Sequence, residues 1–121
     1  MRLRWHKYSG NNMILLAVAA ALATTASPTV PSFESGNSIY SSCAGTGTHY
    51  TACLGYITGV ADTYLYLQVT RRLPQMICFP LGVTQGQIVD TVVRFLVDHP
   101  ESRHTTASSL VRDALKSAFP C

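Results

Sequence analysis

The sequence predicts an all-α protein, a small disulfide-bonded bundle of about four helices. Two observations favour helices: apolar residues recur at helical spacing in several stretches, and no alternating strand pattern extends over any length. A third observation concerns the ends of these stretches, which carry capping residues, glycine or proline where helices start or stop. No internal repeat is evident, so we expect a single domain.

The first 26 residues are typical of a secretory signal peptide. Three basic residues, at positions 2, 4 and 7, precede an apolar run at 13–23. Both 21–23 and 24–26 have small residues at the −3 and −1 positions of a cleavage site. The apolar run is too short to span a bilayer comfortably, which favours a cleaved signal over an uncleaved anchor. We therefore expect a periplasmic protein with a signal peptide at 1–26, a flexible leader at 27–37 and a helical domain at 38–121.

Loss of the signal peptide changes the charge of the chain. The full sequence has a formal net charge of +3, which comes from the three basic residues of the signal. The remainder has six basic and six acidic residues and is formally neutral. It therefore lacks the basic surface that nucleic-acid binding needs, and we expect no nucleic acid and no membrane as partners after cleavage. About 95 residues suffice for one domain with a modest core.

Two helices are expected in the first half of the domain. Residues 35–38 offer N-cap candidates for a short helix at 39–43, which Gly45 can end. A longer helix begins at His49 and ends before Thr70. One face of it carries eight residues, mostly apolar: Cys53, Leu54, Ile57, Val60, Ala61, Tyr64, Leu65 and Gln68.

Gly55 and Gly59 lie one turn apart on this longer helix. In a helix each glycine costs roughly 0.5–1 kcal/mol relative to alanine, so a compensating role is expected. We expect another helix to approach the backbone closely here, either within the fold or across a two-fold axis, with nearby tyrosines framing the contact. Asp62, in the middle of the same helix, is either a buried functional carboxylate or an ordinary surface residue.

The C-terminal stretch 78–121 is interpreted as two helices folded back on each other. Thr84 and Gln87 form a capping-box pattern at the start of the first helix, which ends before Pro100. The second helix restarts with Pro100 or Glu101 in its first turn. Its apolar residues follow helical spacing: Ala107, Leu110, Val111, Ala114, Leu115 and Ala118. A turn this short makes the two helices antiparallel neighbours.

Four cysteines in an exported chain of this size indicate two structural bridges. The hairpin brings its open ends together, which places Cys78 within reach of Cys121. Cys43 and Cys53 then pair by elimination. Four cysteines allow three connectivities, so a bridge between Cys53 and Cys78 stays an alternative.

No arrangement of reactive side chains predicts catalysis. A catalytic cysteine would leave a bridge partner unpaired, and no Gly-x-Ser-x-Gly elbow is present. Asp98, His99, Glu101 and His104 gather around one turn, but their spacing matches no His-Glu-x-x-His motif, and the cysteines lack zinc spacing. We therefore expect a protein that is not an enzyme and that needs no metal or other cofactor.

Five segments of the domain occur in a characteristic order. They are residues 53–62, 77–80, 83–87, 99–101 and 114–121 (CLGYITGVAD, ICFP, VTQGQ, HPE and ALKSAFPC). This ordered set resembles the Rap/Tai group of periplasmic immunity proteins of type VI secretion, which neutralise peptidoglycan amidase effectors. The resemblance covers roughly residues 38–121. It implies a helical domain, a homodimer, that binds an effector amidase and blocks it.

Three functions from different classes follow. The leading hypothesis is a periplasmic immunity protein that occludes the active-site cleft of an amidase effector. The alternative is a periplasmic stress or chaperone-like helical protein without catalytic activity. A small cell-wall hydrolase ranks third.

The turn between the two C-terminal helices is the candidate partner-binding surface. An inhibitor of a cleft enzyme needs a rigid projection with polar anchors, and Pro100 restricts this turn. The candidate contact residues are Asp98, His99, Glu101, Arg103 and His104. An ordinary solvated turn is the competing interpretation, and the exposed face of the helix at 84–97 is the next candidate surface.

Overall fold

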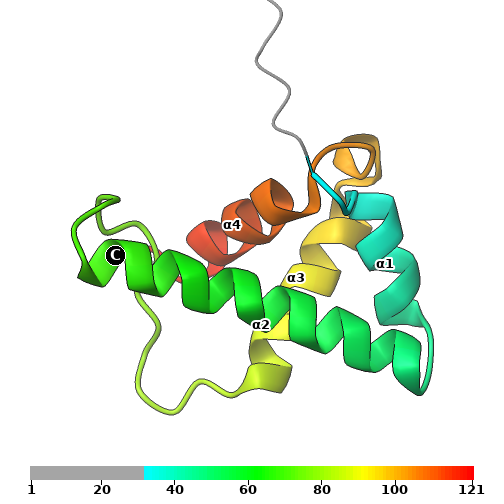
Figure 1. Ribbon diagram of the computed structural model, residues 1–121, viewed down its shortest axis with the longest axis horizontal. Helices are drawn as coiled ribbons and strands as arrows, with labels where there is room; N and C mark the ends of the chain where they lie inside the picture. Colours follow the sequence, from blue (N-terminus) through cyan, green and yellow to red (C-terminus); the bar gives the residue numbers. More distant parts are fainter. Residues whose placement is uncertain (1–31) are drawn as a thin grey trace, which may run out of the picture.

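The computed structural model describes residues 32–121, and this part of the chain is all-α (Figure 1). It contains the helices α1 (Gly36–Ala44), α2 (Thr48–Val69), α3 (Gln85–Asp98) and α4 (Ala107–Ala118), and a 3-10 turn at Pro100–Ser102. The longest helix, α2, packs against the other three. The predicted fold class is confirmed. The predicted signal peptide at 1–26 lies outside the described residues.

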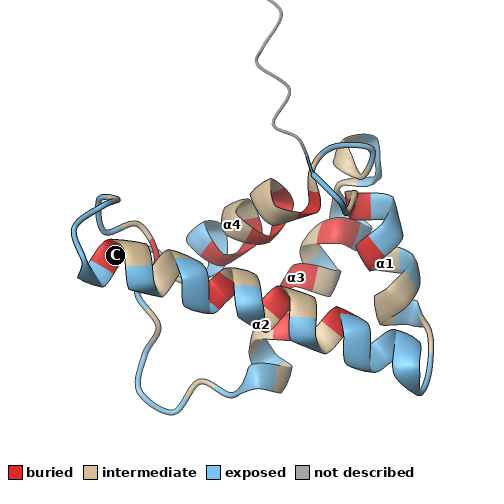
Figure 2. Ribbon diagram, viewed as in Figure 1, coloured by how far each residue is buried: buried red, intermediate tan, exposed pale blue. Residues whose placement is uncertain are grey.

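The core forms where α2 meets α3 and α4. Figure 2 shows the buried residues on the sides of these helices that face one another. Ile57 of α2, Leu96 of α3 and Leu115 of α4 are each no more than 1% exposed. Burial of an aliphatic side chain of this size stabilises a fold by roughly 1.5–3 kcal/mol. The face that helical spacing predicted for α2 therefore holds its buried residues.

The segment before α1 pairs with the segment before α4. Ser35 and Thr106 form an isolated antiparallel bridge, and the Gly36 N–H donates a hydrogen bond of 2.9 Å to the Thr105 carbonyl. Gly36 is required by this contact, because a Cβ added there would lie 2.7 Å from the Arg103 carbonyl oxygen. Ser35 also caps α1 by accepting from the Ser38 N–H. The start of the domain is thus fixed to a part of the chain about 70 residues later.

The predicted start of the last helix is wrong. Pro100 does open a helical turn, but the turn is a 3-10 turn that ends at Ser102, and α4 begins at Ala107. Thr106 has non-helical backbone (φ −58°, ψ 125°) and forms the bridge with Ser35. A helix running through Thr106 would remove that pairing. The link between α3 and α4 is therefore longer than the short turn that was expected, although the two helices still pack together.

Other helix ends follow their local sequence signals. Thr84 caps α3 with both bonds of the capping box: its side chain accepts from the Gln87 N–H, and the Gln87 side chain accepts from the Thr84 N–H. α1 begins at Gly36, two residues before the predicted domain start, and Gly45 ends it. Ala118, expected on the buried face of α4, is exposed at the last turn.

Both predicted disulfides are confirmed. Cys43 is bonded to Cys53, and Cys78 is bonded to Cys121. The second bridge holds the C-terminus against the segment that precedes α3, where the Cys78 N–H also donates to the Phe119 carbonyl at 2.8 Å. Phe79 and Phe119 pack edge to face beside it, with ring centroids 5.0 Å apart.

Gln68 holds the irregular segment that follows α2. This buried side chain, 6% exposed, accepts from the N–H groups of Met76 and Ile77 at 2.8 and 2.9 Å. Its amide nitrogen donates to the Ile77 carbonyl at 2.9 Å. One side chain therefore satisfies three backbone groups in a segment that has no helix or sheet to satisfy them.

The expectation that Gly55 and Gly59 admit another helix of the same fold is wrong. A Cβ added at either position would meet nothing within 4 Å, so this side of α2 is open. Asp62 is exposed as well, which fits the interpretation as a surface residue. No helix within residues 32–121 combines the length and apolar character that crossing a membrane requires.

Candidate partner-binding surface

Four of the five candidate contact residues lie on the link between α3 and α4, and Asp98 is the last residue of α3. The five fall into two groups. Asp98, Glu101 and His104 are exposed. His99 and Arg103 are half-buried and make contacts inside the fold. The link therefore presents three polar side chains to solvent on a backbone that the other two hold in place.

His99 is fixed to the end of α3. Its Nδ1 lies 2.8 Å from the Phe95 carbonyl oxygen, and because that oxygen only accepts, Nδ1 is the donor. The His99 ring stacks on the Phe95 ring with centroids 4.1 Å apart and an interplanar angle of 22°. The backbone N–H of His99 donates to the same carbonyl and caps the helix. These contacts make His99 a support for the link.

Arg103 connects the link to α1. Its guanidinium lies 4.2 Å from the centroid of the Tyr40 ring, a cation–π distance. The Arg103 carbonyl accepts from the Asn37 N–H at 2.6 Å. The Nε atom of Arg103 is buried and makes no hydrogen bond within the described residues. Arg103 therefore contributes more to the fold than to a contact with a partner.

A shallow groove of about 520 Å³ runs between α2 and α4. Gly55, Gly59 and Tyr64 line its α2 side and Ser108 its α4 side. Tyr56 also lines the α2 side, and burial raises the pKa of its phenol above the usual value. The phenol is therefore neutral at physiological pH. Gly55 and Gly59 had marked this face of α2 as a possible contact surface in the sequence. Nothing in the sequence indicated that Ser108 of α4 borders the groove.

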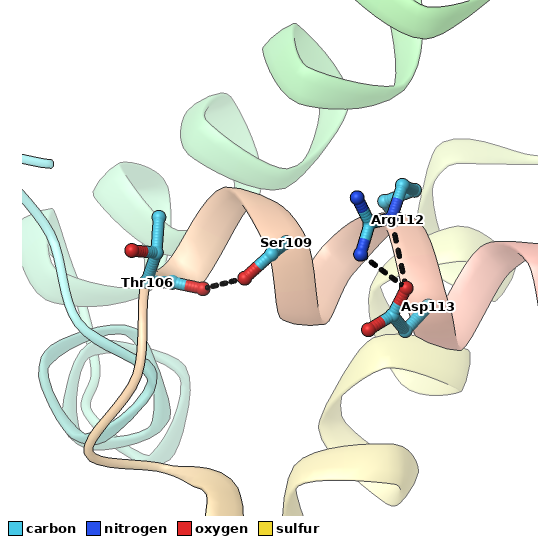
Figure 3. Close-up of polar contacts among 4 residues, drawn as sticks. All are labelled: Thr106, Ser109, Arg112 and Asp113. Atoms are coloured by element: carbon cyan, nitrogen blue, oxygen red, sulfur yellow. Dashed lines mark hydrogen bonds and ion pairs between the residues drawn. The ribbon is translucent and has the colours of Figure 1, made fainter. Parts of the chain in front are cut away.

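The outer side of α4 carries a charge pair that neutralises itself. Figure 3 shows the Arg112 side chain turned onto Asp113, with two contacts of 2.8 Å to the same carboxylate oxygen. The hydrogen bond with Asp113 raises the pKa of Arg112 further. At the start of the helix, the Ser109 hydroxyl donates to the Thr106 carbonyl at 2.7 Å (Figure 3). This part of α4 thus offers little free charge to a partner.

Comparison with known families decides the classification. The sequence model of the family described as Rap1a immunity proteins matches residues 35–121. The chain belongs to the Rap1a immunity family. A comparison with curated protein sequences finds no relative.

The Rap1a match covers the complete helical unit. It begins at Ser35, the N-cap of α1 and the residue that bridges to Thr106, and it ends at Cys121 of the second disulfide. The resemblance seen in the sequence is thereby confirmed. Membership of an immunity family implies an effector as the binding partner, and such families are generally not catalytic. Within residues 32–121, no group of three or more His, Cys, Asp and Glu side chains is placed to hold a metal ion.

Proposed function

We propose that this Rap1a-family protein is a periplasmic immunity protein that binds a type VI secreted peptidoglycan amidase and blocks its active-site cleft, without catalysing a reaction. The family match across the whole helical domain is the observation that carries the proposal. Two further features support the cellular location. The N-terminal sequence has the pattern of a secretory signal, and both disulfides suit an oxidising compartment.

The link between α3 and α4 is the surface that we propose enters the cleft. Asp98, Glu101 and His104 supply polar contacts, while His99 and Arg103 hold the backbone from beneath. A projection that is already ordered loses little conformational entropy on binding. Binding energy in protein interfaces is concentrated in a few residues, so removal of three contact side chains is a sensitive test.

Replacement of Asp98, Glu101 and His104 together by alanine is expected to weaken binding to the amidase at least tenfold. The assay uses a catalytically inactive form of the amidase effector, which is identified by co-purification from the native host and titrated by calorimetry. Because the three side chains are exposed, the melting temperature is expected to stay within a few degrees of the wild type. Asp62→Ala, an exposed acid on α2, is the matched control and should bind like the wild type.

Two results would show that the contact surface lies elsewhere. If the triple variant binds with unchanged affinity, the link is an ordinary solvated turn. If Asp90→Ala together with Arg94→Ala on the exposed side of α3 then weakens binding, the surface lies on that helix.

We also propose that the protein is a homodimer whose two-fold contact uses the open side of α2. Gly55 and Gly59 leave room for a close approach, and Tyr66, 66% exposed, lies farther along the same helix. A symmetric contact places the same patch of each copy against the other. Light scattering at micromolar concentration measures the molar mass, and a monomer would contradict this arrangement.

A further inference from the structure

α2 ends in a left-handed turn at an unusual residue. Arg71 has φ 57°, and it is the one residue other than glycine with positive φ in the described part of the chain. Its N–H donates to the Gln68 carbonyl at 3.1 Å, and the Arg72 N–H donates to the Leu67 carbonyl at 2.8 Å. These two bonds form a Schellman motif, in which the left-handed position usually holds glycine because any Cβ is unfavourable there.

Helix electrostatics explain only part of this choice. Positive charge next to the C-terminus of a helix is favourable, which accounts for a basic residue at Arg72. It does not account for a side chain at the position where glycine fits best. Backbone strain of this kind is concentrated at functional sites, so the guanidinium of Arg71 itself is the feature to explain.

The surroundings of Arg71 have the features of a binding surface. Both Arg71 and Arg72 are exposed, and the ion pair found within residues 32–121 involves neither of them. They border a hollow of about 720 Å³ that no acidic side chain lines: Gln68, Val69, Arg71, Arg72, Leu73, Pro74 and Gln75. Val69, which lines the hollow, is 80% exposed. Arginine next to exposed apolar surface is typical of the centre of protein interfaces.

We propose that the α2 tip, residues 69–75, binds a carboxylate-rich surface of the effector, with Arg71 and Arg72 as anchors. This inference rests on the proposed function. A guanidinium pairs with a carboxylate through two parallel hydrogen bonds, and two unpaired cations favour an acidic partner by charge complementarity. Figure 1 shows the α2 tip and the link between α3 and α4 at opposite ends of the molecule. The α2 tip is therefore a contact separate from that link.

The variant Arg71→Gly with Arg72→Gln separates binding from folding. Glycine relieves the unfavourable backbone at position 71, so the melting temperature is expected to stay equal or rise. Affinity for the catalytically inactive amidase effector is expected to fall at least tenfold, and the dependence of this affinity on salt concentration is expected to become weaker. The matched control is Lys116→Ala, which removes an exposed cation on α4 and should leave the affinity unchanged.

A second measurement does not require the amidase. In nuclear magnetic resonance titrations with a hexaglutamate peptide, backbone amides of residues 68–75 are expected to shift in the wild type and to stay in place in the double variant. Equal shifts in both proteins, or preferential binding to phosphatidylglycerol vesicles, would overturn the proposal.

The amidase titration separates this inference from the proposed function. If the wild type binds the amidase and the double variant binds equally well, the inference fails and the proposed function stands. If the wild type does not bind the amidase at all, both fail.

Discussion

Replacement of Cys78 and Cys121 by serine is expected to lower the free energy of unfolding by about 4 kcal/mol. The bridge closes a loop with a sequence separation of 43 residues. Without the bridge the unfolded chain has more conformational entropy, which favours unfolding. The native state also loses the constraint that holds Phe119 against Phe79. A domain of this size has a total stability of roughly 5–15 kcal/mol, so the change is a large fraction of it.

Urea unfolding of the oxidised proteins, followed by circular dichroism, measures this effect. The comparison is a variant in which alanine replaces Cys43 and Cys53, whose bridge spans 10 residues and contributes roughly 3 kcal/mol through loop closure. Both cysteines of the longer bridge are exposed, so serine there introduces no buried hydroxyl. A loss below about 1 kcal/mol for the Cys78 and Cys121 variant would show that packing alone holds the C-terminus.

Gln68→Leu is expected to destabilise the fold by about 3 kcal/mol, because each buried backbone group left without a partner costs roughly 1–3 kcal/mol. Leucine is close to glutamine in size, so the packing around α2 changes little. It makes none of the bonds to the two N–H groups and the carbonyl of Met76 and Ile77. Ile77 is 2% exposed, so water does not readily replace those bonds.

The matched control for Gln68→Leu is Gln85→Leu. Gln85 is exposed and makes one side-chain bond, of 3.2 Å, to Thr58. Its replacement should change the free energy of unfolding by less than about 0.5 kcal/mol, as is usual for surface positions. Hydrogen exchange at the amides of Met76 and Ile77 provides a local readout. Protection that persists in Gln68→Leu would mean that another group satisfies this segment.

Local signals in the sequence predicted the parts of the fold that local physics determines. The capping box at Thr84 and the buried face of α2 depend on neighbours within a few residues, and they were predicted correctly. The start of α4 was not, because it depends on pairing between Thr106 and Ser35, which are far apart in the sequence. Gln68 was placed on the buried face correctly, but its partners lie in an irregular segment that periodicity does not describe.

The same distinction applies to the candidate surface. The sequence identified a polar link, and Asp98 and Glu101 are exposed as a contact surface requires. The role of His99 has a signal in the sequence, since Phe95 precedes it by four residues and therefore lies on the same side of the helix. Arg103 has no such signal, because Tyr40, the ring it contacts, lies far away in the sequence. The positive φ of Arg71 also has no signal in the sequence, and only the structure shows it.

Inhibition of the amidase effector by the mature protein tests the central claim most directly. The amidase is assayed on peptidoglycan fragments while the oxidised chain, without residues 1–26, is titrated into the reaction. Immunity predicts that turnover falls to background near equimolar protein and that the chain itself releases no product. Full amidase turnover in the presence of excess chain would contradict the assignment as an amidase immunity protein.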